Sequence, residues 1–263
     1  MSRKSTRVKF ENQNGQTLVG ILDLPLNDVK FSALFAHCFT CGKDLKALVR
    51  LSRLMTQAGI AVLRFDFTGL NDSAGDFSET NLSTNIADVQ SAVTFLSRTI
   101  LPPALLVGHS LGGTALTIAA NDIPSARALI TIASPSSTKR LAEFLSAENP
   151  EIDTPHGGRI TIGGKEFLLK QQLLENLRSH DVETALANLK LPILMFHSPQ
   201  DQTLPYHWGL KMFNAAGGNK AFVTLDGSDH LLAERPEDVE FVAKIAINWA
   251  ERYIKQQDFT KPQ

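Results

Sequence analysis

Three side chains in this sequence have the types and the order needed for nucleophilic catalysis, and the first is a serine in a glycine-rich turn. Residues 108–112 read Gly-His-Ser-Leu-Gly. A serine hydroxyl is a weak nucleophile at neutral pH and needs a base within hydrogen-bond reach. The pattern predicts Ser110 as a nucleophile where an apolar strand leads into the turn and a helix leads out of it. The alternative is a glycine-rich turn that merely contains a serine.

The base is sought among seven histidines. In chains with this type of turn, the order is serine, acid, histidine. His230 ends the segment Leu-Asp-Gly-Ser-Asp-His at 225–230, between the last predicted strand and the last predicted helix. That loop lies at the carboxyl edge of the predicted sheet, where the sites of open α/β sheets are found. We therefore predict His230 as the base, with a surface-loop histidine as the alternative.

The acid that orients this base is predicted to be Asp201. A carboxylate that accepts the second imidazole N–H holds the neutral ring in the tautomer that can take a proton. Asp201 follows a predicted strand by a short loop. Asp229 adjoins His230 and would have to fold back on itself, so it is the weaker choice.

Acyl transfer also needs hydrogen-bond donors directed at the developing oxyanion. One is predicted to be the backbone N–H of Leu111, directly after the nucleophile, and the second the backbone N–H of Phe39, in the loop after an earlier strand. Side chains predicted to contact the substrate are Phe39, His109, Phe144 and Phe167, of which the phenylalanines could form an aromatic slot.

Two cysteines occur in the chain, Cys38 and Cys41, in a C-x-x-C spacing. Two cysteines are no disulfide framework, and this favours the cytoplasm. The favoured interpretation is two small apolar residues in a packed loop. A redox switch beside the oxyanion hole is the alternative, because a helix start can lower the pKa of a thiol. Two cysteines with no arranged third ligand do not predict a metal site.

Apolar, β-rich runs alternate with helix-length amphipathic stretches along the chain, which predicts an α/β fold with a mostly parallel sheet. An Asn-Gly pair at 14–15 indicates a hairpin at the start. The predicted strands cover 6–10, 17–24, 31–37, 60–65, 103–107, 128–132, 193–196 and 221–225. The predicted helices cover 45–55, 86–96, 111–120 and 236–253.

Residues 135–190 interrupt this alternation. The stretch is too long for a structureless connection in a compact domain. Two β-rich runs surround Gly163 and Gly164, which predicts a two-residue hairpin with helical segments on either side. We predict a small cap over the sheet, inserted in a single domain that covers 1–263; a decorative insertion is the alternative.

The bulk composition excludes several classes of protein. Hydrophobic residues make up 43% of the chain and charged residues 20%, as in ordinary globular domains. A formal net charge of −1 gives no reason to expect nucleic acid or an anionic membrane as a partner. No apolar run approaches the ~20 residues that span a bilayer. A monomer or a homodimer is expected.

Five segments together resemble α/β-hydrolase esterases. They are His-Cys-Phe-Thr-Cys-Gly-Lys-Asp at 37–44, Phe-Asp-Phe-Thr-Gly-Leu at 65–70, Gly-His-Ser-Leu-Gly-Gly at 108–113, His-Ser-Pro-Gln-Asp at 197–201 and Leu-Asp-Gly-Ser-Asp-His at 225–230. The resemblance is closest to the hydrolase half of proteins that fuse such a domain to an OsmC-type domain, and it spans nearly the whole chain. That second domain is absent from this sequence, so the chain is a stand-alone relative or a truncated one. The cap also resembles that of hydroxycinnamoyl (feruloyl) esterases.

Two positions depart from the family pattern. Cys38 replaces the glycine of the usual His-Gly-Phe, where a side chain narrows the oxyanion loop. Asn71 stands where many relatives carry glycine in a Gly-x-Gly-x-Ser turn. Asparagine tolerates left-handed backbone geometry, so we expect this turn to survive.

The motifs and the resemblance together predict a serine carboxylic ester hydrolase that works without a cofactor on a small to medium ester. The alternative within enzymes is a hydroxycinnamoyl (feruloyl) or thioester hydrolase. A different class is a non-catalytic binding module or a module for a redox partner, because a fold does not by itself imply a function.

Overall fold

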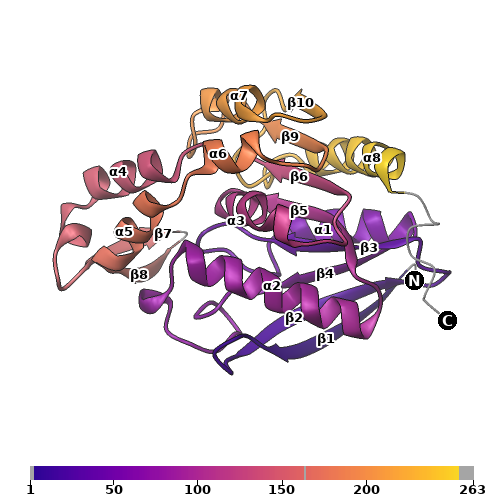
Figure 1. The fold of residues 1–263 in the computed structure, drawn as a ribbon, viewed down its shortest axis with the longest axis horizontal. Helices are drawn as coiled ribbons and strands as arrows, with labels where there is room; N and C mark the ends of the chain where they lie inside the picture. Colours follow the sequence, from indigo (N-terminus) through magenta and orange to yellow (C-terminus); the bar gives the residue numbers. More distant parts are fainter. Residues whose placement is uncertain (1–2, 163, 255–263) are drawn as a thin grey trace.

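A computed structural model describes residues 3–162 and 164–254 of the chain (Figure 1). Within these residues, eight strands form one sheet in the order β1-β2-β4-β3-β5-β6-β9-β10. Strands β1 and β2 pair antiparallel, as do β2 and β4, and the remaining neighbours pair parallel. The predicted mostly parallel α/β sheet, with an antiparallel hairpin at its start, is confirmed.

The elements follow one another along the chain in a regular alternation. The strands of the main sheet are β1 (Arg3–Glu11), β2 (Thr17–Pro25), β3 (Phe31–Ala36), β4 (Ile60–Phe65), β5 (Pro103–His109), β6 (Ala128–Ile132), β9 (Ile193–His197) and β10 (Lys220–Thr224). The helices around it are α1 (Lys46–Gln57), α2 (Leu82–Thr99), α3 (Leu111–Ala119), α6 (Val182–Ala187), α7 (Tyr206–Ala215) and α8 (Pro236–Tyr253), with short 3₁₀ turns at η1 (Phe77–Glu79) and η2 (Ala120–Asp122).

The central strands are apolar on both faces because helices cover both faces of the sheet. In β3, Ala33 and Phe35 pack in a core shared with α1 and α8. Leu34 and Ala36 point the other way, into a core shared with α2 and α3. All six residues of β3 are buried, so every side chain of this strand helps to fix the position of the loop that follows it.

Local sequence signals set the starts of the longer helices. Asn81 caps α2 by accepting the N–H of Thr84, whose side chain in turn accepts the N–H of Asn81, which forms a capping box. Pro236 opens α8, where its missing N–H has no helical partner to lose. These starts agree with the alternation predicted from the sequence.

Residues inserted between β6 and β9 form a second, smaller group of elements. These are α4 (Thr138–Glu148), η3 (Pro150–Asp153), the antiparallel strands β7 (Gly158–Ile162) and β8 (Lys165–Leu169), and α5 (Gln171–Ser179). Figure 1 shows α4, α5 and this hairpin beyond one end of the main sheet. The predicted hairpin is present, although Gly163 at its tip lies outside the described residues.

Helix α7 is absent from the sequence prediction. Gly209 in its middle weakens the helical signal, since glycine is a poor helix former. A Cβ at this position would lie 2.6 Å from Nδ1 of the buried His197. A tertiary contact therefore requires the glycine, and local propensity alone conceals the helix.

Candidate active site

Ser110 occupies the single residue between the end of β5 and the start of α3. Its backbone has φ 52° and ψ −126°, a conformation that residues other than glycine rarely adopt. Its N–H donates to the carbonyl of Ile132 on the neighbouring strand at 2.8 Å. The predicted strand–turn–helix context is thus present, and the turn lifts the serine above the end of the sheet.

Three glycines allow the backbones around Ser110 to approach closely. A Cβ at Gly108 would collide with the backbone of Gly113, and a Cβ at Gly112 would collide with the carbonyls of Ala36 and His37. Helix α3 therefore sits directly against the end of β3. This contact places the N-terminus of the helix beneath the serine, where its dipole favours negative charge.

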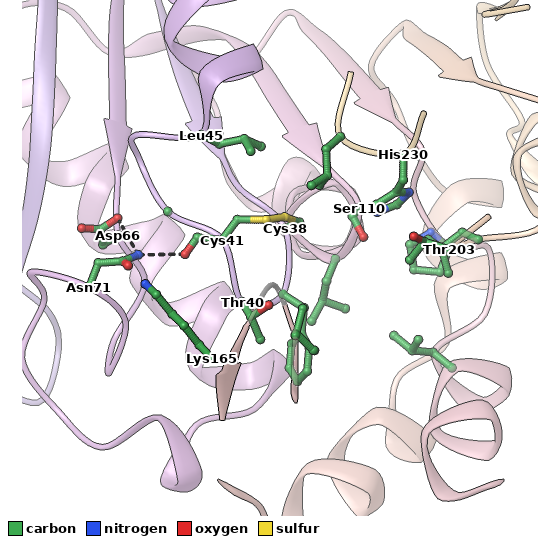
Figure 2. A pocket seen from close by; sticks show the side chains of 18 of the residues that line it. Cys38, Thr40, Cys41, Leu45, Asp66, Asn71, Ser110, Lys165, Thr203 and His230 are labelled. Atoms are coloured by element: carbon green, nitrogen blue, oxygen red, sulfur yellow. Dashed lines mark hydrogen bonds between the residues drawn. A yellow bond between two sulfur atoms is a disulfide. The ribbon is translucent and has the colours of Figure 1, made fainter. Parts of the chain in front are cut away.

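Asp201 and His230 come from two different loops and meet at the same edge of the sheet. Asp201 follows β9, and His230 lies between β10 and α8. His230 Nδ1 donates a hydrogen bond of 2.7 Å to Asp201 Oδ2, and both residues are buried. Ser110 and His230 line one cavity, and Figure 2 shows both at the same wall of it.

A turn of the backbone and a second histidine hold the Asp201 carboxylate. Its Oδ1 accepts the N–H groups of Thr203 and Leu204, each at 2.8 Å. His197 Nε2 donates to the carbonyl of Leu204 at 3.1 Å and lies 3.5 Å from Asp201 Oδ2. Burial by itself raises the pKa of the Asp201 carboxyl, but the hydrogen bonds from His197 and His230 outweigh it, so this pKa lies well below its usual range.

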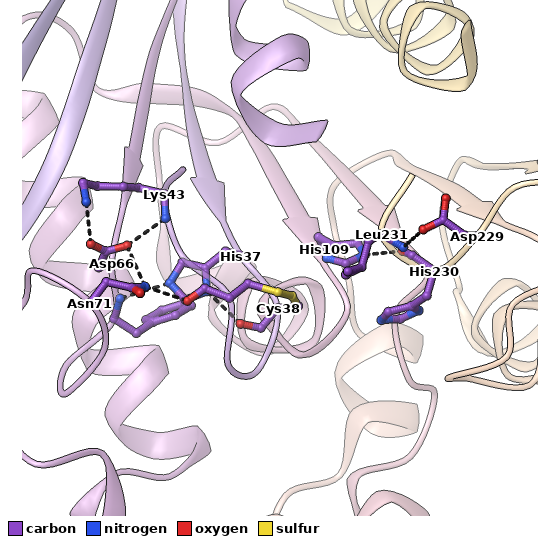
Figure 3. The surroundings of a disulfide bond; sticks show 11 residues. His37, Cys38, Lys43, Asp66, Asn71, His109, Asp229, His230 and Leu231 are labelled. Carbon is purple, nitrogen blue, oxygen red and sulfur yellow. Dashed lines mark hydrogen bonds and ion pairs between the residues drawn. A yellow bond between two sulfur atoms is a disulfide. The ribbon is translucent and has the colours of Figure 1, made fainter. Parts of the chain in front are cut away.

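His109 is turned away from the cavity. Its Nε2 donates to the backbone carbonyl of His230 at 2.7 Å (Figure 3), and its ring lies 4.9 Å from the ring of His230. Burial, together with the neighbouring His230, lowers the pKa of His109 to about 3. It is missing from the cavity lining, so the predicted contact with substrate has no support, and the ring instead holds the backbone of His230.

Cys38 and Cys41 are joined by a disulfide with Cα atoms 5.2 Å apart (Figure 3). The favoured interpretation of them as two unlinked apolar residues is therefore wrong. The cytoplasmic location, predicted because two cysteines are no disulfide framework, stays a prediction. The Cys41 N–H donates to the Cys38 carbonyl at 3.3 Å, so the bridge closes a tight turn.

Side chains from two directions hold the ends of this turn. His37 Nδ1 donates to the Cys38 carbonyl at 2.7 Å, while His37 Nε2 accepts the Phe67 N–H at 3.2 Å. Burial lowers the pKa of His37, which agrees with a neutral ring that uses both nitrogens. At the other end, Asn71 Nδ2 donates to the Cys41 carbonyl at 2.8 Å. Asn71 has φ 48°, so the expected left-handed turn is confirmed.

A cluster of charged side chains anchors the chain just beyond the disulfide. Lys43 donates to Asp66 through both its backbone N–H (2.7 Å) and its ammonium (2.8 Å). The same ammonium lies 2.7 Å from Asp72 and 3.1 Å from Asp44. Although burial by itself lowers the pKa of Lys43, the hydrogen bonds and charges of these carboxylates raise it well above its usual range. Sequence reasoning missed this cluster: Lys43, Asp44 and Asp66 lie in two of the segments that carry the family resemblance, but nothing in the sequence indicates that the two segments meet.

A cavity of about 770 Å³ opens in front of Ser110. Its lining includes Phe39 and Phe144, two of the side chains predicted to contact the substrate. Phe167 lies outside the lining and packs edge-on against Phe77, with ring centroids 5.2 Å apart. Most of the remaining apolar lining comes from the inserted elements and from the loops after β9 and β10. These residues are Leu141, Leu145, Ile162, Leu177, Leu204 and Leu231.

The two backbone N–H groups predicted to bind an oxyanion have no acceptor within the described ranges 3–162 and 164–254. Leu111 is the first residue of α3, where helical N–H groups have no partner in their own helix. Phe39 lies inside the disulfide turn, and Phe39, Leu111 and Ser110 all line the cavity. Among the described residues, the two N–H groups therefore have no protein partner, and both belong to residues that border the cavity.

Two kinds of feature are absent from the part of the chain that the structure describes. No group of three or more His, Cys, Asp or Glu side chains is arranged there to hold a metal ion. No helix in these residues is both long and apolar enough to cross a bilayer.

The sequence and the fold match known proteins. The model of the alpha/beta hydrolase family matches residues 33–240. The chain belongs to the alpha/beta hydrolase family. The esterase domain of a Rhodothermus marinus protein is 40% identical, with a TM-score of 0.77, and the match covers 95% of this chain and 99% of that one.

More distant relatives include a second solved structure and a curated lipase. Est1E of Butyrivibrio proteoclasticus, solved with bound ferulic acid, has a TM-score of 0.79 at 21% identity, over 94% of this chain and 99% of that one. Lysophosphatidylserine lipase ABHD12 of Mus musculus is 25% identical over 219 residues, which are 82% of this chain and 52% of that protein. The chain thus spans about half the length of this curated relative.

As an alpha/beta hydrolase, the chain places a serine, an imidazole–carboxylate pair and two unpartnered N–H groups around one cavity. Such a set can deprotonate an alcohol, attack a carbonyl carbon and stabilise the resulting oxyanion. The sequence analysis named Ser110, Asp201 and His230 as candidates, but it gave no role to His197, which lies 3.5 Å from Asp201. It predicted the turn at Asn71 but not the hydrogen bond from Asn71 to the Cys41 carbonyl. The signals for both were weak: a histidine that ends a strand, and an asparagine in place of a glycine.

Proposed function

We propose that this chain is a serine hydrolase that cleaves carboxylic esters through an acyl-enzyme. The observation that carries the proposal is the 2.7 Å hydrogen bond from His230 Nδ1 to Asp201, at the wall of the cavity that Ser110 also lines. This bond leaves the lone pair on Nε2 of the neutral ring, the atom that must accept the serine proton.

In the proposed reaction, Ser110 Oγ attacks the acyl carbon while His230 Nε2 takes its proton. Asp201 stabilises the imidazolium that forms and keeps its own charge, in agreement with its lowered pKa. His230 then protonates the leaving alcohol, and a water molecule hydrolyses the acyl-enzyme by the same relay. The Phe39 and Leu111 N–H groups are proposed to bind the oxyanion of both tetrahedral intermediates.

The cavity supports a substrate of small to medium size. Its volume of about 770 Å³ falls within the range typical of small-molecule sites, roughly 300–1,000 Å³. Leu141, Phe144 and Leu145 of α4 line the cavity, together with Leu177 of α5. We infer that the apolar part of the ester lies under α4. The segment 135–190 then serves as a cap that shapes the site.

A hydroxycinnamoyl ester is the second candidate, since two phenylalanines, Phe39 and Phe144, line the cavity. The third predicted member of an aromatic slot, Phe167, packs against Phe77 instead. Two rings rather than three therefore support a phenolic substrate. The finer resemblance, to the hydrolase half of OsmC-type fusion proteins, and the thioester alternative stay predictions from sequence.

A fluorophosphonate probe combined with ester turnover tests the proposal. Wild-type protein is expected to take up one probe per chain at Ser110 and to hydrolyse nitrophenyl esters. Ser110→Ala is expected to take up none and to lose kcat by roughly 10⁴-fold or more, because the attacking oxygen is gone. Methyl ferulate in the same panel compares the two substrate classes.

Ser134→Ala is a suitable control, since this serine is buried close to Gly113 but is absent from the cavity lining. The Ser134→Ala variant should still be labelled by the fluorophosphonate probe. A folded wild type that neither labels nor turns over any ester would favour the non-catalytic binding module. Ester turnover by Ser110→Ala, at a rate near that of wild type, would refute the serine mechanism.

A further inference from the structure

The disulfide between Cys38 and Cys41 lies in the wall of the cavity beside the nucleophile. Both cysteines line this cavity together with Ser110, and Figure 2 shows the two sulfur atoms facing it. Cys38 is 5% exposed, and Cys41 is more exposed than Cys38. A molecule that enters the cavity therefore meets a disulfide as well as a serine.

The bridge encloses the backbone that carries one proposed oxyanion donor. His37 holds the carbonyl of Cys38, and Asn71 holds that of Cys41, so both ends of the turn are fixed by side chains. Between them, in residues that the structure describes, the N–H of Phe39 has no hydrogen-bond acceptor. Its ring packs against Phe77 at 5.4 Å, but the disulfide is the covalent restraint on its backbone.

The disulfide between Cys38 and Cys41 is expected to add little to the stability of the folded chain. A disulfide restricts the unfolded chain less when the ring it closes is short, and this ring holds only the residues from Cys38 to Cys41. The hydrogen bonds of His37 and Asn71 also hold the same two carbonyls without it. A role in the site explains the position of the bridge better than a role in folding.

We propose that Cys38–Cys41 is a thiol–disulfide exchange site for a small dithiol, and that its reduction slows ester hydrolysis at Ser110. The first part stands on the accessibility of the sulfur atoms from the cavity. The second part rests on the proposed function, since it needs Phe39 to act as an oxyanion donor.

The exchange transfers two electrons and two protons. A thiolate of the small dithiol attacks Sγ of Cys41, the more exposed of the two residues, and the bond to Cys38 breaks. Cys38 leaves as a thiolate and takes a proton. The second thiol of the reagent then attacks the mixed disulfide, which releases Cys41 as a thiol and leaves the reagent as a cyclic disulfide. The chain gains two thiols, and the dithiol is oxidised.

Reduction changes the geometry of the turn that carries the Phe39 N–H. Bonded sulfur atoms lie about 2.0 Å apart, whereas two thiols must separate to van der Waals contact. Because hydrogen bonds hold the carbonyls of Cys38 and Cys41, the larger distance between the two sulfur atoms must be accommodated by the residues between the cysteines. Oxyanion donors act only in a narrow range of positions, and losing one costs roughly 10²–10³-fold in kcat. A displaced donor is therefore expected to cost at least about tenfold.

The first measurement counts thiols on the folded protein. The oxidised chain is incubated with increasing dithiothreitol and then alkylated, and the mass gives the number of modified cysteines. The chain has only these two cysteines, so the assignment is direct. Cys38 and Cys41 are expected to be alkylated together without denaturant. A bridge that resists reduction until the protein unfolds would overturn the exchange site.

The second measurement follows kcat/KM for a nitrophenyl ester in the same samples. It is expected to fall at least about tenfold as the two thiols form, and to recover on oxidation with a small disulfide. The variant Cys38→Ser/Cys41→Ser should have the activity of the reduced protein and no response to dithiothreitol. If this variant does not fold, the reduced wild type alone decides the question.

The outcomes separate this inference from the proposed function. Two free thiols with unchanged kcat/KM would overturn the link to the oxyanion donor. If both redox forms fail to turn over esters and to bind a fluorophosphonate, the proposed function fails, while the thiol count still decides whether the exchange site exists. Fluorophosphonate labelling that persists in the reduced form would place the loss in the oxyanion loop and not in the folding of the serine turn.

Discussion

At the scale of single residues, the two oxygens of the Asp201 carboxylate have different partners. Oδ1 accepts two backbone N–H groups of its own loop, which fixes the carboxylate in space. Oδ2 faces His230 and accepts its Nδ1–H. The loop therefore orients the acid, and the acid orients the imidazole. These contacts explain how His230, the proposed base, is held in one tautomer although it comes from a separate loop.

Two other buried histidines hold this pair without facing the cavity. His109 Nε2 bonds to the backbone of His230, and His197 Nε2 bonds to the backbone of Leu204. Within the described part of the chain, Nδ1 of each of these two rings has no hydrogen-bond partner. Burial lowers the pKa of His109, and a protonated ring there would bury an unpaired N–H, so this ring acts as a neutral donor. Both histidines contact the backbone of the loops that carry His230 and Asp201.

Phe144 offers a test of the inferred apolar subsite. Its ring is 47% exposed and lines the cavity from α4. Phe144→Ala should lower kcat/KM for long-chain or aryl nitrophenyl esters by about fivefold, because an apolar contact of roughly 1 kcal/mol is lost. Turnover of the acetyl ester should change little. A chain-length series measured on both proteins checks this.

The matched control is Phe241→Ala on α8, where the ring is 48% exposed and absent from the cavity lining. It should leave the whole series unchanged. Equal effects of Phe144→Ala on short and long esters would contradict an apolar subsite under α4.

At the scale of elements, the position of Ser110, the proposed nucleophile, depends on the close packing of α3 against β3. Gly112→Ala would place a Cβ against the backbone carbonyls of Ala36 and His37, which cannot rotate away. We expect a loss of about 2 kcal/mol or more in the free energy of unfolding, as overpacking typically costs 1–3 kcal/mol. Chemical denaturation measures this, and ester turnover reports the displacement of Ser110.

The matched substitution is Gly113→Ala in the same turn of the same helix. Its Cβ would meet chiefly the hydroxyl of Ser134, a single rotatable group. Alanine also favours a helix over glycine by up to about 1 kcal/mol. The cost at this position should therefore be clearly smaller. Similar losses for the two variants would show that the backbone contact at Gly112 is not what restricts α3.

The elements that the sequence predicted are those whose pattern is local. The apolar runs of β3 and β5 are buried on both faces, so their composition alone marks them as central strands. Helix α7 was not predicted, because the glycine at position 209 is required by the contact with the His197 ring and not by the helix itself. The triad candidates were found because a fixed chain order links them, although nothing local joins Asp201 to His230.

At the scale of the whole molecule, the cavity was beyond sequence reasoning. Its walls combine α4, the β7–β8 hairpin, the loop after β3 and the loop after β9. How these segments face one another depends on contacts between distant parts of the chain, such as the packing of Phe167 on Phe77. The disulfide had an equally weak signal, since a C-x-x-C spacing is compatible with free thiols as well as with a bridge.

Buried neutral histidines connect the active-site edge to the acid stability of the fold. The pKa of His109 is lowered to about 3 by burial, against about 6.5 in an unfolded chain. Between these values the unfolded state binds the extra proton, so the free energy of unfolding falls as pH drops below about 6.5. One such group contributes up to about 1.4 kcal/mol per pH unit. His37, whose pKa burial also lowers, adds to the same slope.

His109→Gln isolates this contribution, because the glutamine amide keeps a donor for the His230 carbonyl but does not titrate. Urea denaturation of both proteins between pH 6.5 and pH 4.5 gives the two slopes. We expect the free energy of unfolding to change more steeply with pH in the wild type than in the variant, by an amount that approaches one bound proton. Carboxylates with a lowered pKa lose their stabilising effect only at lower pH, and they contribute equally to both proteins. Parallel slopes would mean that His109 takes up its proton in the folded state, and that its ring is not held neutral against the backbone of His230.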